Sequence, residues 1–196
     1  MNDTPVRAVE SGNTGQESEM VRETINSVLH QAYSFNAGES AIFRHAAGLR
    51  ARELKMNARI LLQSLFNEKP SESLRDAVLA GLEVFCLQKA KSGKVRFKNQ
   101  AAYFYRKALK DDDKGCVRRI ENLAKNRKNG NRRFYKDLIS YCRYVISKDQ
   151  LINVASLIRD VYYWDTHRSK DQWIEAFSDS IKEKGETNNE QEQGTN

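Results

Sequence analysis

The sequence has 196 residues, of which 39% are hydrophobic and 30% are charged, and its formal net charge is +7. This length predicts one ordinary domain or two small ones packed together, with an apolar core and a well-solvated surface. No stretch approaches the roughly 20 apolar residues of a membrane-spanning helix, and the first residues lack the apolar centre of a secretory signal. Three scattered cysteines without CxxC spacing indicate reduced thiols, so we expect a cytoplasmic protein without a membrane partner.

Between two polar ends, residues 1–17 and 183–196, apolar residues recur with the helical period of 3.6. Both ends are expected to be disordered, because neither carries apolar residues at a regular spacing. A first helix is expected from Ser18 to about Asn36–Gly38, and a second helix from Ser40. The second helix carries three arginines that are expected to point outward, away from its apolar face: Arg44, Arg50 and Arg52.

Two further apolar patterns lie on either side of a proline, and the second of them is long and strongly apolar. Ser71 or Ser73 is expected to cap this long helix, since a serine hydroxyl accepts a hydrogen bond from the first turn. The glycine that follows the helix then breaks the chain. We expect this break to separate an N-terminal helical part, residues 18–92, from a C-terminal basic helical part, residues 93–182.

The C-terminal part is expected to begin with a helix at Asn99–Lys110, and the acidic run Asp111–Asp113 should cap the next helix. After a turn at Asn129–Gly130, further helices are expected to about Val145, at Leu151–Trp164 and at about Ser169–Ile181. No segment shows the strict alternation of a half-buried strand. The expected fold is therefore all-α: a compact bundle of about eight to nine helices in two packed helical halves, with disordered N- and C-terminal tails.

Positive charge is concentrated in one segment of the chain. Between Lys91 and Lys148, eighteen basic and five acidic residues give a net charge of +13, which leaves −6 for the rest of the chain. Such an asymmetry indicates a polyanionic partner, and nucleic acid is the commonest one. A basic surface that serves only solubility is the alternative.

Helical spacing places the charges of this segment off its apolar faces. Arg118, Arg119 and Lys125 lie away from the apolar side of their helix, and Arg132, Lys136 and Arg143 form a stripe on the next helix. The linker Arg127–Asn131 adds donors without any acid. This pattern predicts binding to sugar-phosphate backbone rather than to bases. A helix-turn-helix reading of duplex DNA is conceivable, but its second helix would expose only a narrow strip.

Aromatic residues of the same segment could stack on bases, although residues at helical spacing belong more often to the core. They are Tyr103, Phe104, Tyr105, Phe134, Tyr135, Tyr141 and Tyr144. The sequence offers no catalytic constellation, because its three histidines are far apart and it has no Gly-rich phosphate loop. Asp111–Asp113 is better explained as a solvated cap than as a magnesium site. We therefore expect no enzyme, no cofactor and no metal.

Four short motifs follow one another in the C-terminal half: FYRKAL (104–109), CVRRIENL (116–123), LINVASLIRDVYYWD (151–165) and DQWIEAF (171–177). This series resembles the small subunit of the type I-E CRISPR surveillance complex Cascade, the CasB family. AIFRHAAGLR (41–50) looks like the opening helix of that family, and the match spans roughly residues 40–177. Ile120 stands where the family has an aromatic residue, and Phe43 and His45 flank a single Arg44.

The resemblance implies an all-helical, two-part, non-catalytic protein that pairs with itself inside the complex. It also implies a basic groove that holds the target and displaced DNA strands and braces the CRISPR RNA. By motif position, Arg106 falls on one family arginine and Arg118 and Arg119 on a second, paired site. Arg44 falls on the opening helix, and Arg168 and Lys170 on a basic turn. Four residues fall on late motifs that pack helices: Asp160, Trp164, Trp173 and Phe177.

Our hypothesis is that backbone contacts from these cations favour the opened DNA, or R-loop, because strand exchange is nearly balanced in free energy. The contacts are expected from Arg106, Arg118, Arg119, Lys125, Arg127, Arg132, Arg133 and Arg143, with Arg44, Arg168 and Lys170 as further candidates. A helical adaptor whose basic face docks on an acidic protein is one alternative, and an autonomous DNA-binding regulator is another. Binding to bare single strands separates the adaptor from the first hypothesis, and sequence preference on duplex DNA identifies the regulator.

Overall fold

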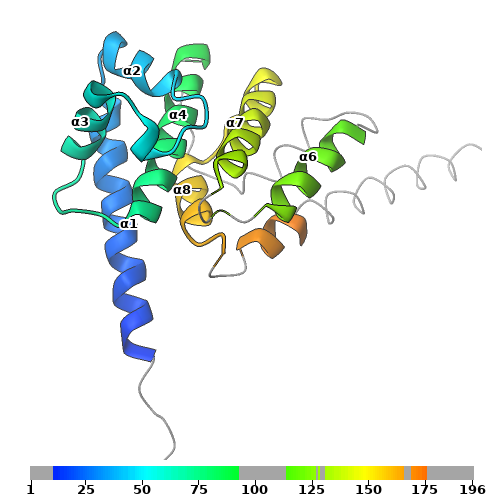
Figure 1. Ribbon diagram of the computed structural model, residues 1–196, viewed down its shortest axis with the longest axis horizontal. Coiled ribbons are helices and arrows are strands. Elements are labelled where there is room, and N and C mark those ends of the chain that lie inside the picture. The colour runs from blue at the N-terminus through cyan, green and yellow to red at the C-terminus, as the bar shows by residue number, and fades with distance from the viewer. Residues whose placement is uncertain (1–10, 93–113, 127, 129–130, 166–168, 176–196) are drawn as a thin grey trace, which may run out of the picture.

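The computed structural model describes residues 11–92, 114–126, 128, 131–165 and 169–175. These residues form helices, and none of them forms a strand, which confirms the all-α prediction (Figure 1). The elements are α1 (Ser11–Tyr33), α2 (Ala37–Arg44), the 3-10 turn η1 (Ala51–Glu53), α3 (Met56–Ser64), α4 (Glu72–Ser92), α6 (Lys114–Lys125), α7 (Arg132–Ser147) and α8 (Val154–Tyr162). Residues 169–175 are helical as well. The predicted helix at Asn99–Lys110, the acidic run Asp111–Asp113 and the acidic tail lie outside the described residues.

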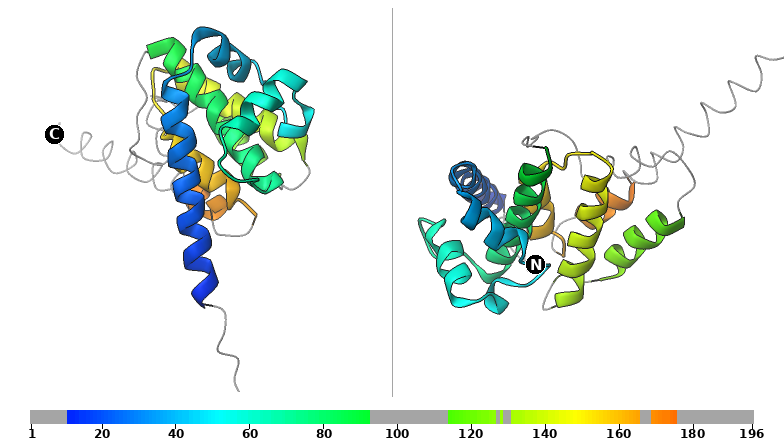
Figure 2. Two further views of the ribbon diagram at one scale, coloured as in Figure 1. Left: turned by 90° about the vertical axis from the view of Figure 1, so that its left-hand side faces the viewer. Right: turned by 90° about the horizontal axis from the view of Figure 1, so that it is seen from above.

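Helix α4 is the centre of the body. It packs against α1, α2, α7 and α8, and its side chains are buried nearly all round the helix. Burial on every side requires neighbours on every side, and the buried carboxylates Asp76 and Glu83 of this helix are paired with arginines. In Figure 1 and in the view from above in Figure 2, α1 lies at one end of the body and α6 at the other, with α7 between α6 and α4.

Two helix starts differ from the prediction. Helix α1 begins at Ser11 instead of Ser18. In the stretch before Ser18, the Glu17 carboxylate accepts a hydrogen bond of 3.1 Å from the hydroxyl of Tyr162. Helix α2 begins at Ala37 instead of Ser40, because Asn36 and Glu39 form a capping box in which each side chain accepts the other's backbone N–H at 2.9 Å. Neither Ser18 nor Ser40 is therefore a helix start.

Arg50 was expected to point outward and is instead buried, so this prediction is wrong. Its Nε donates to Asp76 at 2.8 Å and its Nη2 to Glu72 at 2.9 Å. Asp76 also accepts the backbone N–H of Ala51 at 2.8 Å, which fastens η1 to α4. Local helical spacing could not reveal this pair, because α2 ends at Arg44, Arg50 lies outside any helix, and both acids lie on α4.

The C-terminal part packs on aromatic side chains. The apolar face of α7 is buried throughout: Phe134, Leu138, Tyr141, Cys142 and Val145. Asp160 of α8 is buried and accepts a hydrogen bond of 3.0 Å from Trp173 Nε1, while Trp164 meets Trp173 edge-to-face with ring centroids 5.3 Å apart. These three residues therefore pack helices, as the motif resemblance implied, whereas Phe177 lies outside the described residues.

Candidate nucleic-acid interface

The candidate cations lie largely on an antiparallel hairpin formed by α6 and α7. At one end of the hairpin, Asn126 Nδ2 donates to Asp137 Oδ2 at 2.9 Å. At the other end, the guanidinium of Arg119 lies 4.6 Å from the ring centroid of Tyr144. The two contacts hold the C-terminus of α6 beside the N-terminus of α7, and both helices lie together in Figure 1. A hairpin of this kind presents charges from two helices on one rigid support.

Five of the exposed cations of the hairpin are called the basic face below: Arg118, Lys125, Arg132, Arg133 and Lys136. Three of them form ion pairs at long distance, Lys125 with Glu121 at 3.9 Å, Arg133 with Asp137 at 3.7 Å and Arg132 with Glu53 at 3.6 Å. Exposed pairs of this kind contribute at most about 1 kcal/mol. A phosphate can therefore replace these carboxylates at small cost. Arg118 and Lys136 form no ion pair with any residue of the described ranges.

Arg143 differs from the cations of the basic face. Its Nη2 donates to Glu83 Oε1 at 2.8 Å, and the Glu83 side chain is only 1% exposed. The backbone N–H of Gly48 donates to the other oxygen of Glu83 at 3.0 Å. Burial raises the pKa of Glu83, and these two donors act in the opposite direction. Arg143 thus neutralises a buried carboxylate, and this contact occupies part of the guanidinium that the sequence assigned to phosphate.

The segment between α2 and η1 borders the other side of α7. Gly48 has a φ of +68°, and a Cβ at this position would come within 2.8 Å of Lys136 Cα and of the Tyr135 carbonyl oxygen. Only glycine allows the two backbones to approach so closely. The carbonyl of Arg44, which is half-buried, accepts a hydrogen bond of 3.4 Å from Arg143. This segment therefore brings Arg44 next to the hairpin.

Lys128, in the linker that was expected to add exposed donors, is buried at 4% exposure. Its Nζ donates to Ser73 Oγ at 2.6 Å and to the carbonyl of Tyr162, and its backbone N–H donates to Asp165 at 3.2 Å. Burial lowers its pKa. Lys128 therefore anchors the hairpin to α4 and α8 and is not one of the free donors that the linker was expected to add.

The remaining predicted positions differ in where they lie. Arg106, Arg127 and Arg168, together with Tyr103, Phe104 and Tyr105, lie outside the described residues. Lys170 is half-buried on the helical stretch 169–175, where Trp173 packs against Tyr141 of α7 at 5.6 Å between ring centroids. Phe134, Tyr135 and Tyr141 are buried in the core and cannot stack on bases. Tyr144 is half-buried between two cations, Arg119 and Lys148.

Three further properties concern metal binding, membrane spanning and thiol chemistry. Within the described ranges, no three His, Cys, Asp or Glu side chains come close enough together to hold a metal ion. In the same part of the chain, no helix is both long enough and apolar enough to cross a membrane. Cys86 and Cys142 are buried and unbridged, and burial raises the pKa of the Cys86 thiol to about 11. Thiols in such surroundings are poor nucleophiles.

Solved structures share this arrangement of helices. CasB of M. ruber matches with a TM-score of 0.68 over 85% of this chain and 97% of its own length, at 14% identity. The chain has a CasB-like fold. CasB from Thermobifida fusca matches with a TM-score of 0.55 over 81% of this chain and 96% of its own length, at 12% identity. No protein-family model and no curated protein sequence matches the chain.

The CasB-like fold confirms the resemblance that the short helical motifs indicated. The matches span nearly the whole length of both CasB chains and more than four fifths of this chain. At identities of 14% and 12%, these matches show that the fold is similar.

Proposed function

We propose that the chain is the small, non-catalytic subunit of a Cascade-type, CRISPR RNA-guided complex. The observation that carries this proposal is a CasB-like fold over 85% of the chain whose outermost hairpin exposes a set of arginines and lysines. In this role the protein works in the cytoplasm and pairs with a second copy. It contacts larger Cascade subunits, the CRISPR RNA and the target DNA strands.

The basic face is the part of the protein that meets nucleic acid. Arginine and lysine bind phosphate oxygens irrespective of the base, so such a face holds strands without reading sequence. Exchange of a DNA duplex for an RNA–DNA hybrid is nearly balanced in free energy, so a few backbone contacts to the opened strands favour the R-loop. Arg44, Arg106, Arg119, Arg127, Arg168 and Lys170 are further candidates for these contacts. Arg143 and Lys128 act indirectly, because they hold the hairpin in place.

Native copurification tests the proposal. The tagged full-length protein, expressed at its natural level, is expected to copurify with a short repeat-derived RNA and with larger protein subunits that bind that RNA. A variant with Arg118, Lys125 and Arg133 changed to alanine should still join the complex but should retain less opened target DNA. Copurification with a single acidic protein and no RNA would support the adaptor alternative and contradict the proposal.

A further inference from the structure

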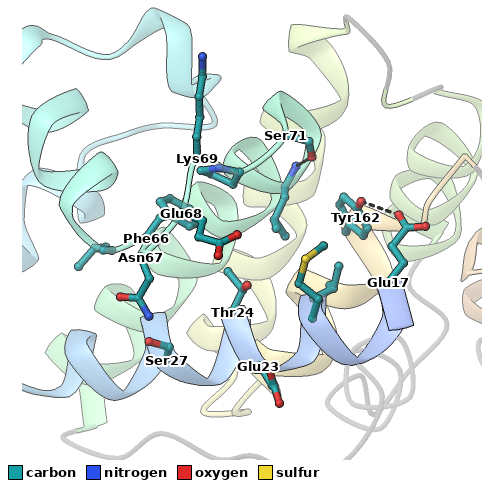
Figure 3. A pocket seen from close by; sticks show the side chains of 15 residues that line it. Glu17, Glu23, Thr24, Ser27, Phe66, Asn67, Glu68, Lys69, Ser71 and Tyr162 are labelled. Atoms are coloured by element: carbon teal, nitrogen blue, oxygen red, sulfur yellow. Dashed lines mark hydrogen bonds between the residues drawn. The ribbon is translucent and has the colours of Figure 1, made fainter. Parts of the chain in front are cut away.

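A groove lies outside the basic face, between α1, the segment that joins α3 to α4, and the end of α8 (Figure 3). Its volume is about 620 Å³. The α1 side runs from Glu17 to Ser27, and the opposite wall runs from Leu65 to Ser71. Tyr162 closes one end, where its hydroxyl bonds to Glu17. The part of α1 that lines the groove is about 15 Å long, or between two and three helical turns.

The groove combines an apolar floor with an acidic rim. The buried side chains of Val21, Leu65, Phe66 and Leu74 form the floor, and Met20, which is 54% exposed, extends it toward solvent. The rim carries three exposed carboxylates and one exposed ammonium group: Glu17, Glu23, Glu68 and Lys69. An exposed methionine suits a docking surface, because its flexible side chain adapts to different partners.

The charge of the rim limits what can bind. Phosphates of nucleic acid and anionic lipid headgroups are both repelled by a surplus of carboxylates. The α1 wall of the groove lies away from α6, since α1 and α6 are at opposite ends of the body in two views (Figures 1 and 2), whereas Tyr162 at the end of the groove contacts Lys128 in the linker between α6 and α7. An occupant must therefore carry apolar side chains for the floor and positive charges for the rim.

We propose that this groove binds an amphipathic helix of a partner protein, with its apolar side on the floor and its lysines or arginines beside the rim carboxylates. The length of the groove accommodates two to three turns of such a helix, and docking of an apolar helix face into a groove is a common recognition mode. Complementary charge at the rim sets the orientation of the helix and excludes acidic competitors. The site is independent of nucleic-acid binding at the basic face.

Methionine NMR tests the proposal directly. The sequence contains three methionines, and Met20 lies in the groove whereas Met56, 69% exposed on α3, lies outside it. The full-length protein, labelled with 13C at the methionine methyl groups, is titrated with a synthetic leucine–lysine amphipathic peptide of about 18 residues, long enough to form a helix on docking. The Met20 signal is expected to shift and the Met56 signal to stay. Equal shifts at both methionines, or none, would overturn the proposal.

Charge reversal tests the role of the rim. The double variant Glu23→Lys/Glu68→Lys should bind the peptide at least about tenfold more weakly than the wild type. The matched control Asp171→Lys/Glu175→Lys carries the same change of net charge on exposed residues outside the groove and should stay within about twofold of the wild type. Equal weakening in both variants would contradict a specific site.

A leucine–glutamate peptide of the same length should not bind the wild type, and its binding would also count against the proposal. Single-stranded DNA binding is measured on the same variants. The variant Glu23→Lys/Glu68→Lys should still bind single-stranded DNA. Loss of peptide binding at the groove and loss of DNA binding at the basic face are therefore separate results.

Discussion

Removal of Arg143 should destabilise the protein in a pH-dependent way. Glu83 is 1% exposed and is held by the Arg143 guanidinium and the Gly48 N–H, at 2.8 and 3.0 Å. The variant Arg143→Ala leaves a buried carboxylate with one donor fewer. Breaking a fully buried pair costs about 3–5 kcal/mol, but Arg143 is itself 48% exposed, so water can partly replace it. We expect a loss of about 2 kcal/mol at neutral pH, or about 4–8 °C in Tm.

The sign of the pH effect follows from the pKa of Glu83, which burial raises above its ordinary value. A group with a raised pKa in the folded state supports the fold best below its ordinary pKa, and this support is lost as the pH rises through the folded-state pKa. The Arg143 guanidinium lowers the pKa of Glu83, so the folded-state pKa of Glu83 rises further when Arg143 is removed. The difference between variant and wild type should therefore be larger at about pH 7.5 than at about pH 5.

Thermal melting, monitored by circular dichroism at both pH values, measures this difference. In a Glu83→Gln background the carboxylate is absent, so Arg143→Ala should cost less than about 0.5 kcal/mol. A cost that is equal in both backgrounds, or one that does not change with pH, would refute the account of Arg143 as the partner of a buried acid.

Three further changes test other parts of the structure by the same melting assay. Gly48→Ala should lower stability by at least about 2 kcal/mol, because the added Cβ meets the backbone of α7 and the φ is positive; an unchanged Tm would contradict this close approach. Lys128→Met should cost about 1–3 kcal/mol, since it leaves Ser73 Oγ and the Tyr162 carbonyl unpaired; a more stable variant would show that the buried ammonium is dispensable. Arg133→Ala should change stability by less than about 0.5 kcal/mol because its ion pair is exposed, and a loss above about 1 kcal/mol would assign it a structural role.

Sequence periodicity predicted the class of fold and the buried faces, because helix packing is visible in local spacing. The inner faces of α4 and α7 follow the expected pattern, and Ser71 caps α4 by accepting the Leu74 N–H at 3.2 Å. The start of α2 was missed, although an Asn-x-x-Glu capping box at Asn36 was present in the sequence. Ser40 offers a competing helix start in the sequence, but the cap at Asn36 begins the helix three residues earlier.

The site was predicted less well than the fold, because the role of a cation depends on residues far away in the sequence. By helical spacing Arg50 and Arg143 look like surface arginines, but acids of α4 hold Arg50 in the interior and pair with Arg143 at the surface. The linker sequence predicts donors at this position, whereas Ser73 and the Tyr162 carbonyl hold Lys128 in the interior. No local pattern distinguishes a cation that pairs across the fold from one that faces solvent. Arg118 and Lys125, by contrast, are exposed as the helical wheel indicated.

The salt dependence of single-stranded DNA binding tests the basic face most directly. The variant Arg118→Ala/Lys125→Ala/Arg133→Ala is compared with the control Arg22→Ala/Lys55→Ala/Lys69→Ala, which removes the same charge from exposed residues elsewhere. Each phosphate contact contributes roughly −0.7 to the log–log slope on single strands, so the first variant should be shallower than the wild type by about 2. The control should keep the wild-type slope. If both variants changed the slope equally, binding would depend on net charge alone and the basic face would not be the nucleic-acid site.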